Sequence, residues 1–125
     1  MESEAASIDP AAVLGKPARV TIALPSGGER LVHGLVSRFR QAGSVEAHVR
    51  YEAELVPWLW MLSLSMGCRI YQHLSVPEIV TAVFDELGYE DYRLQLVRSY
   101  PPREFCVQYR ETHLDFVSRL LEDEG

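Results

Sequence analysis

The sequence predicts an α+β fold, in which antiparallel strands are combined with two amphipathic helices. Several short runs alternate apolar and polar residues, which is typical of half-buried strands. Two other runs have apolar residues at helical spacing, and each begins with a capping motif. The chain has 125 residues, 47% of them hydrophobic, so it can bury the core of one ordinary domain.

A β-hairpin is predicted near the N-terminus. Val20, Ile22 and Leu24 alternate with smaller or polar residues, and "PSGGER" then supplies turn residues. A second alternating run begins at Leu31. Gly27 belongs to this turn, which favours a hairpin over a phosphate-binding loop.

The clearest predicted strand covers residues 45–55. Every odd position is apolar, and every even position is polar. One face is therefore expected to pack, and the other to meet water or a polar partner. The polar face comprises Glu46, His48, Arg50, Glu52 and Glu54.

The stretch "PWLWMLSLSMG" follows this strand and is predicted as a short helix, although its apolar residues also alternate. A short strand is then expected over residues 68–72. The next segment has the strongest helix signature, because Ser75 and Glu78 form a capping box and Gly88 provides a stop. The predicted buried stripe of this helix is Val76, Ile79, Val80, Val83, Phe84 and Leu87.

Two further strands are expected over residues 92–96 and 105–109, separated by "SYPPRE". A last helix begins at Thr112, with Asp115 completing a second capping box. Arg119 has the spacing to pair with Asp115 and Asp123 on this helix. The residues predicted to be buried are Leu114, Val117, Leu120 and Leu121.

Charge and apolar content exclude several partners. The formal net charge is -6 and the arginines are scattered, so we expect no nucleic-acid partner. The acidic N-terminus predicts no cleavable signal peptide. The most apolar stretch, residues 55–66, is too short for a bilayer and contains Pro57, so no membrane anchor is expected.

Side chains that could carry chemistry are sparse. The two cysteines are 38 positions apart, which favours reduced thiols and leaves a disulfide open. The histidines show no zinc-binding spacing. His33 is expected to be a hydrogen-bonded strand side chain and His48 to lie at a surface or interface, whereas His73 and His113, near helix starts, are expected to face solvent. We therefore predict no catalytic, metal or cofactor-binding residues, and Cys106 with His113 remains the one alternative for a small enzyme. The histidines are His33, His48, His73 and His113.

Four sequence blocks resemble a known family. They are "HGLVSRF", "YEAELVPWLWMLSLS", "CRIYQHLSVPEIV" and, above all, "SYPPREFCVQYRETHLDFVSRLLEDEG". They are similar to successive blocks of the VgrG family, the tip proteins of the bacterial type VI secretion system. The resemblance covers about residues 14–125.

The resemblance implies a partial phage hub-like fold, with barrel-like antiparallel strands and an inserted helix-containing lobe. Residues 1–13 would be a flexible arm, residues 14–56 a β-rich barrel segment and residues 57–125 an α+β segment. The acidic last turn of the final helix opposes the helix dipole, and with the resemblance it predicts a chain truncated at its C-terminus. In such a hub, the candidate subunit-interface residues are Trp58, Trp60, Tyr51 and Tyr109.

The function implied is structural rather than enzymatic. Three copies of the full-length protein would form a ring on the Hcp tube, and the spike missing here would carry a PAAR tip protein and effectors. Such a protein would stay in the bacterial cytoplasm until the type VI system secretes it. The alternatives are a tail hub of a phage or another contractile injection system, or the small Cys/His enzyme.

Overall fold

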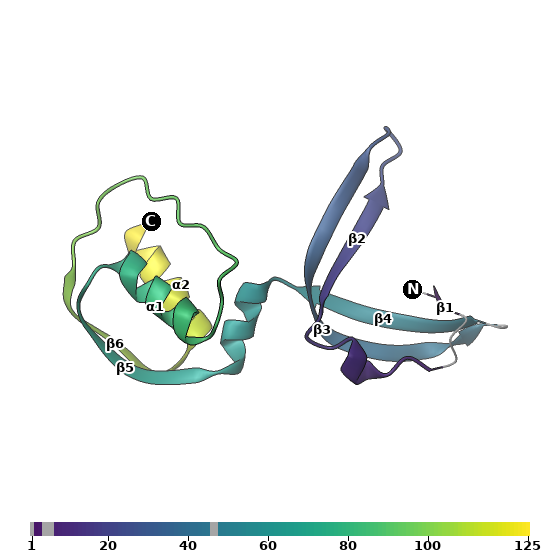
Figure 1. The fold of residues 1–125 in the computed structure, drawn as a ribbon, viewed down its shortest axis with the longest axis horizontal. Helices are drawn as coiled ribbons and strands as arrows, with labels where there is room; N and C mark the ends of the chain where they lie inside the picture. The colour runs from purple at the N-terminus through teal and green to yellow at the C-terminus, as the bar shows by residue number, and fades with distance from the viewer. Residues whose placement is uncertain (1, 4–6, 46–47) are drawn as a thin grey trace. The chain divides into compact units, whose positions relative to one another are not determined.

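The computed structural model describes residues 2–3, 7–45 and 48–125, and it has the α+β composition predicted from the sequence (Figure 1). It divides into two compact units, Met1–Trp58 and Leu59–Gly125. All strand pairs in the described residues are antiparallel. No helix in this part of the chain is long and apolar enough to span a membrane.

The first unit is a four-stranded sheet with the order β1-β4-β3-β2. Its strands are β1 (Glu2–Ser3), β2 (Pro17–Ala23), β3 (Glu29–Val45) and β4 (His48–Val56). Strands β2 and β3 form the predicted hairpin, and Gly27 at its tip has a φ of 81° that glycine adopts without strain. A 3-10 helix, η1 (Pro10–Ala12), precedes β2. Among the described strands the sheet stays open, since β1 and β2 are its two edges.

The prediction of one strand over residues 45–55 is wrong in part. Val45 ends β3 and pairs with His48 at the start of β4, so this stretch contains the end of a hairpin. Residues 46 and 47 lie outside the described residues. The polar face of β4 is exposed as predicted, but on the other face Ala53 is exposed too. The alternation of apolar and polar residues continues from the end of β3 into β4. The sequence pattern therefore gave no sign of the connection between the two strands.

A small core holds the first unit together. Val36, Tyr51 and Val56 are buried, and the Tyr51 ring stacks on Phe39 with centroids 5.4 Å apart. Gly34 lies directly against β4, because a Cβ there would come within 2.5 Å of the Val56 carbonyl oxygen. A side chain at position 34 would therefore clash with the β4 backbone.

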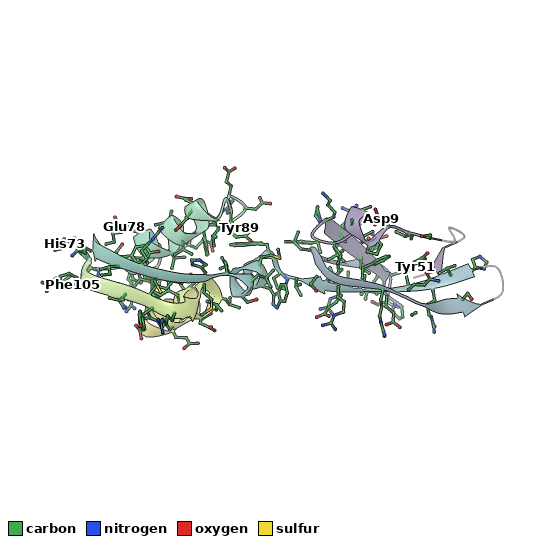
Figure 2. All side chains as sticks on the ribbon, turned by 90° about the horizontal axis from the view of Figure 1, so that it is seen from below. Asp9, Tyr51, His73, Glu78, Tyr89 and Phe105 are labelled. Atoms are coloured by element: carbon green, nitrogen blue, oxygen red, sulfur yellow. The ribbon has the colours of Figure 1, made fainter. Side chains whose placement is uncertain are left out.

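The second unit is a two-stranded ribbon with helices along one side (Figure 1). The unit begins at Leu59, inside the 3-10 helix η2. Figure 2 shows His73 and Phe105 at one end of the ribbon. The short helix predicted after Pro57 and the strand predicted over 68–72 are both present. The elements are η2 (Trp58–Leu64), β5 (Met66–Leu74), α1 (Val76–Glu86), β6 (Arg103–Thr112) and α2 (His113–Glu124).

Helix α1 follows its predicted capping and stripe. The Glu78 carboxylate accepts hydrogen bonds from the Ser75 backbone N–H at 2.8 Å and from the Ser75 hydroxyl at 2.6 Å. Gly88 follows the helix with a φ of 75°, as a stop residue does. The residues of α1 that are buried are Val76, Ile79, Val80, Val83 and Phe84, whereas Leu87 is only half-buried.

Helix α2 starts at the predicted cap but is rotated relative to the predicted stripe. Thr112 accepts a hydrogen bond from the Asp115 N–H at 3.0 Å. Leu114 is half-buried and Leu121 is exposed, so both were wrongly assigned to the core. The rotation is set by Phe116, which stacks on Tyr71 of β5. The residues that are buried are His113, Phe116, Val117 and Leu120.

The strand predicted over residues 92–96 is absent. The chain from Tyr89 to Pro102 forms a long arc between α1 and β6 without joining either sheet (Figure 1). Alternation makes a strand possible, but a strand also needs a neighbouring backbone to pair with. The described residues offer none here.

Candidate assembly surfaces

The outer side of the β5–β6 ribbon is an exposed apolar surface, which we call the ribbon face. Ile70 pairs with Val107, and Cys68 pairs with Tyr109. Because side chains alternate along a strand, these residues project from the side opposite the helices. Their exposed fractions include 63% for Ile70 and 67% for Tyr109. The members of the ribbon face are Met66, Cys68, Ile70, Phe105, Val107 and Tyr109.

The helices fix the ribbon from its inner side. Arg69 of β5 forms a bidentate ion pair with Glu86 of α1. Arg119 of α2 donates to the Val107 backbone carbonyl at 2.6 Å and to the Glu111 carboxylate at 2.8 Å. These contacts hold the exposed side chains of the ribbon face on a packed layer rather than on a loose loop.

A second apolar surface lies on the β2–β3 hairpin, and we call it the hairpin face. Val20 pairs directly with Val32, and Ile22 projects from the same side of β2. Their exposed fractions are between 39% and 45%. A two-stranded hairpin with both sides in water gains little stability from such apolar residues. In the described residues, no layer covers the hairpin face.

The four residues predicted at a subunit interface differ in their surroundings. Tyr51 is 2% exposed and packs within its own unit. Trp58 is half-buried, whereas Trp60 is 37% exposed. Tyr109 belongs to the ribbon face, where the Arg110 guanidinium lies 5.4 Å from its ring centroid. Their interface role stays a prediction.

The ribbon face was not predicted from the sequence. Tyr109 was predicted as an interface residue, but the pairing of β5 with β6, which creates the face, was not. The signal was that Phe105, Val107 and Tyr109 alternate with Cys106 and Gln108, so neither side of β6 carries a run of charges. A strand without a run of charged residues on either side is typical of one that is buried on both faces.

Two ion pairs lie on the polar face of the first sheet. Arg40 donates to the Glu52 carboxylate at 2.8 Å, and Arg38 lies 3.5 Å from the Glu54 carboxylate. In each pair the two residues are directly opposite each other on β3 and β4. Both pairs are exposed, so each contributes at most about 1 kcal/mol to stability.

The geometry gives no support to a Cys106–His113 catalytic pair. Burial raises the pKa of the Cys106 thiol, whereas a nucleophilic cysteine needs a lowered pKa. His113 was expected in solvent but is 8% exposed, and its Nδ1 lies 3.2 Å from the Gln108 amide nitrogen. Among the described residues, no group of three His, Cys, Asp or Glu side chains could hold a metal ion.

The two cysteines lie on opposite sides of the ribbon. Cys68 is exposed on the ribbon face and accepts a hydrogen bond from the Arg110 N–H at 3.4 Å. Cys106 is buried on the helix side. The pairing register places them three positions apart on facing strands, and both thiols are free.

The acidic last turn of α2 has local partners. Arg103 of β6 donates to the Asp123 carboxylate at 3.2 Å and to the Glu124 carboxylate at 2.9 Å. Arg98 also donates to Glu124, at 3.3 Å from its carboxylate. These arginines offset the unfavourable helix dipole, so the acidic turn is explained within this chain.

Comparisons with known proteins place this architecture in a family. A family model described as phage tail baseplate hub (GPD) matches residues 1–125. The type VI secretion system spike protein VgrG1c of Pseudomonas aeruginosa is 46% identical over 128 residues, which cover 99% of this chain and 18% of that protein. The actin cross-linking toxin VgrG1 of Vibrio cholerae is 46% identical over 94 residues, which cover 75% of this chain and 9% of the toxin.

A solved structure agrees with these matches. The E. coli c3393 protein is described as a component of the type VI secretion system with structural similarity to the T4 bacteriophage tail proteins gp27 and gp5. It matches this chain with a TM-score of 0.83 and 33% identity, over 99% of this chain and 34% of that chain. The chain thus spans less than a fifth of the two curated relatives, and the resemblance to VgrG seen in the sequence is confirmed. The chain belongs to the phage tail baseplate hub (GPD) family.

Proposed function

We propose that this chain is the hub segment of a VgrG-type spike protein, a structural component of a type VI secretion system. One observation carries the proposal: a chain matched over its whole length by the hub family exposes two apolar β faces. None of the six members of the ribbon face is charged, which is typical of the centre of a protein interface, and Arg110 lies beside Tyr109 at its margin. Such surfaces suit a protein whose task is to pack against others.

The first unit is proposed to be part of a barrel-like structure. Its sheet has free edges at β1 and β2, and the hairpin face is exposed. Additional strands would pair with an edge and cover that face, which closes a sheet and removes its edges. Those strands would come from the longer polypeptide that the relatives have.

The assembled protein is proposed to be a homotrimer seated on the Hcp tube. The rest of the polypeptide would carry the PAAR tip protein and effectors, and the type VI system would secrete the assembly from the bacterial cytoplasm. The names of the relatives support this role, since VgrG1c is a type VI spike protein. Within the trimer, Trp60 and Tyr109 are the exposed candidates for subunit contacts.

A tail hub of a phage or another contractile injection system is the second candidate. The description of the matching family as a phage tail baseplate hub favours it. Neighbouring genes separate the two: sheath, tube and ATPase genes of a type VI cluster support the first, and capsid and terminase genes the second. For either, we propose no catalytic role for Cys106, whose buried thiol is expected to react slowly with alkylating reagents at neutral pH.

A chimera tests the proposal. The matching segment of VgrG1c is replaced by this chain, and the chimera is assayed for mass by light scattering and for secretion. Val107→Lys places a charge on the ribbon face, and Leu121→Lys is a matched control because both residues are about half exposed. We expect trimers and secretion for the chimera and the control, and loss of both for Val107→Lys. A monomeric chimera, or a Val107→Lys variant that assembles normally, would refute the proposal.

A further inference from the structure

The segment Tyr92–Val97, here called the strap, has the sequence of a strand but belongs to no sheet. Tyr92, Leu94 and Leu96 alternate with residues of the opposite face. The strap forms part of the arc between α1 and β6 (Figure 1). It differs from an ordinary surface loop because three of its six residues are leucine or valine.

One side of the strap lies along α1. The Tyr92 ring meets the Phe84 ring edge-on with centroids 4.9 Å apart, and its hydroxyl donates to Asp85 at 3.4 Å. Leu94 and Leu96 both line a groove of about 400 Å³ against α1. Figure 2 shows Glu78 and Tyr89 at the two ends of this helix. Two leucines separated by one residue on one side indicate a strand-like alternation.

The backbone of most of the strap makes no hydrogen bonds to other backbone groups of the described residues. From Arg93 to Val97, no N–H or C=O group takes part in a backbone hydrogen bond among the described residues. Leu96 is 53% exposed and Val97 is 93% exposed. Residues 92–96 belong to no helix or strand, and the chain bends at Val97 and Arg98. The free donors and acceptors ahead of that bend are a template for an incoming strand.

The outward side chains indicate the chemistry of that strand. By alternation they are Arg93 and Gln95, and Val97 at the bend is outward by its exposure. The strap itself contains no acidic residue, and Glu90 and Asp91 immediately precede it. Arg93 has no ion pair among the described residues, whereas the nearby Arg98 is bound to Glu124. We propose that the strap is a docking edge for an extended strand of another protein that alternates acidic and aliphatic residues. A carboxylate would face Arg93, and an aliphatic side chain would face Val97.

Two capped heptapeptides test this chemistry, one alternating glutamate and valine and the other alternating lysine and valine. Each is titrated into the full chain, with amide hydrogen exchange as the readout. We expect the glutamate peptide to bind at least about fivefold more tightly, because cross-strand charges attract it and repel the lysine peptide. Protection should appear at every second amide of the strap. Equal affinity for the two peptides, or equal protection of all strap amides, would overturn the proposal. Protection without any peptide would mean that two copies of the chain pair with each other, and it would overturn the proposal too.

Variants make the test specific. Gln95→Pro should preserve folding, because the Gln95 N–H makes no backbone hydrogen bond, and should abolish peptide binding. Arg93→Glu should reverse the preference toward the lysine peptide, whereas Arg30→Glu on the hairpin should not. Unchanged urea unfolding verifies that each variant is folded. Full binding by Gln95→Pro, or an unchanged preference in Arg93→Glu, would contradict the pairing.

Discussion

Arg119 shows how a single residue joins two elements of the lobe. Its guanidinium binds the Glu111 carboxylate and the Val107 carbonyl, and it lies 4.9 Å from the Phe116 ring centroid. The sequence predicted partners one helical turn away, at Asp115 or Asp123. The actual partner precedes the helix, because the packing of α2 on β6 brings it closer. Spacing along one helix contains no information about that packing.

This ion pair makes stability depend on pH. The hydrogen bond from Arg119 lowers the pKa of Glu111 in the folded state. Its contribution is therefore complete above the unfolded-state pKa of about 4.3 and is lost as the pH falls through the lower folded value. We expect the free energy of unfolding, measured with urea between pH 2 and 7, to fall less steeply at acidic pH for Glu111→Gln than for the natural chain.

The control for this measurement is Glu104→Gln, which removes an exposed carboxylate on the same strand. It should keep the pH dependence of the natural chain. If Glu111→Gln and the natural chain lose stability in parallel below pH 4.5, the ion pair does not contribute as described.

Gly67 is a second position where one residue decides the packing. A Cβ at this position would lie 2.6 Å from the Gln108 Oε1 atom, and Gln108 is 1% exposed. Gly67→Ala should lower the free energy of unfolding by about 1–3 kcal/mol, because the buried amide must move. In a Gln108→Ala background the same change should cost much less. Equal costs in the two backgrounds, measured by urea unfolding, would exclude this contact as the cause.

At the scale of elements, the cap of α1 is the clearest case of sequence determining structure. Glu78→Ala leaves the buried Ser75 N–H without its acceptor, so we expect a loss of about 1 kcal/mol in unfolding free energy. Glu122→Ala in the exposed last turn of α2 is the control, and it should cost nothing because that carboxylate opposes the helix dipole. A thermal melt in which both variants lose equal stability would contradict the capping role.

The elements that the sequence predicted correctly are those set by local signals. Caps and apolar spacing located α1 and the start of α2, and turn residues located the β2–β3 hairpin. The failures depend on distant partners. The strap alternates like a strand but meets no second backbone, and residues 45–55 alternate across a chain connection. The rotation of α2 was missed because Phe116 is placed by Tyr71, which lies 45 positions earlier.

At the scale of the whole molecule, the main feature of this chain is its two exposed apolar faces. We propose that a complete hub covers the ribbon face and the hairpin face. Neither face was recognisable from single strands. Tyr109 and Trp60 were identified from the sequence as interface candidates, but composition alone could not show that Ile70, Phe105 and Val107 share one side of a ribbon. The four sequence blocks indicated the family, and the pairing register defines the surface.

The reactivity of Cys68 tests most directly whether the ribbon face is covered on assembly. Cys68 lies in the middle of that face and is exposed, and the buried Cys106 is an internal control. Maleimide labelling of both residues is followed by mass spectrometry, in the chain alone and in the assembled VgrG1c chimera. The account predicts that Cys68 reacts readily in the chain alone and at least about tenfold more slowly in the assembly, while Cys106 reacts slowly in both. Equal Cys68 rates in the two samples would contradict it.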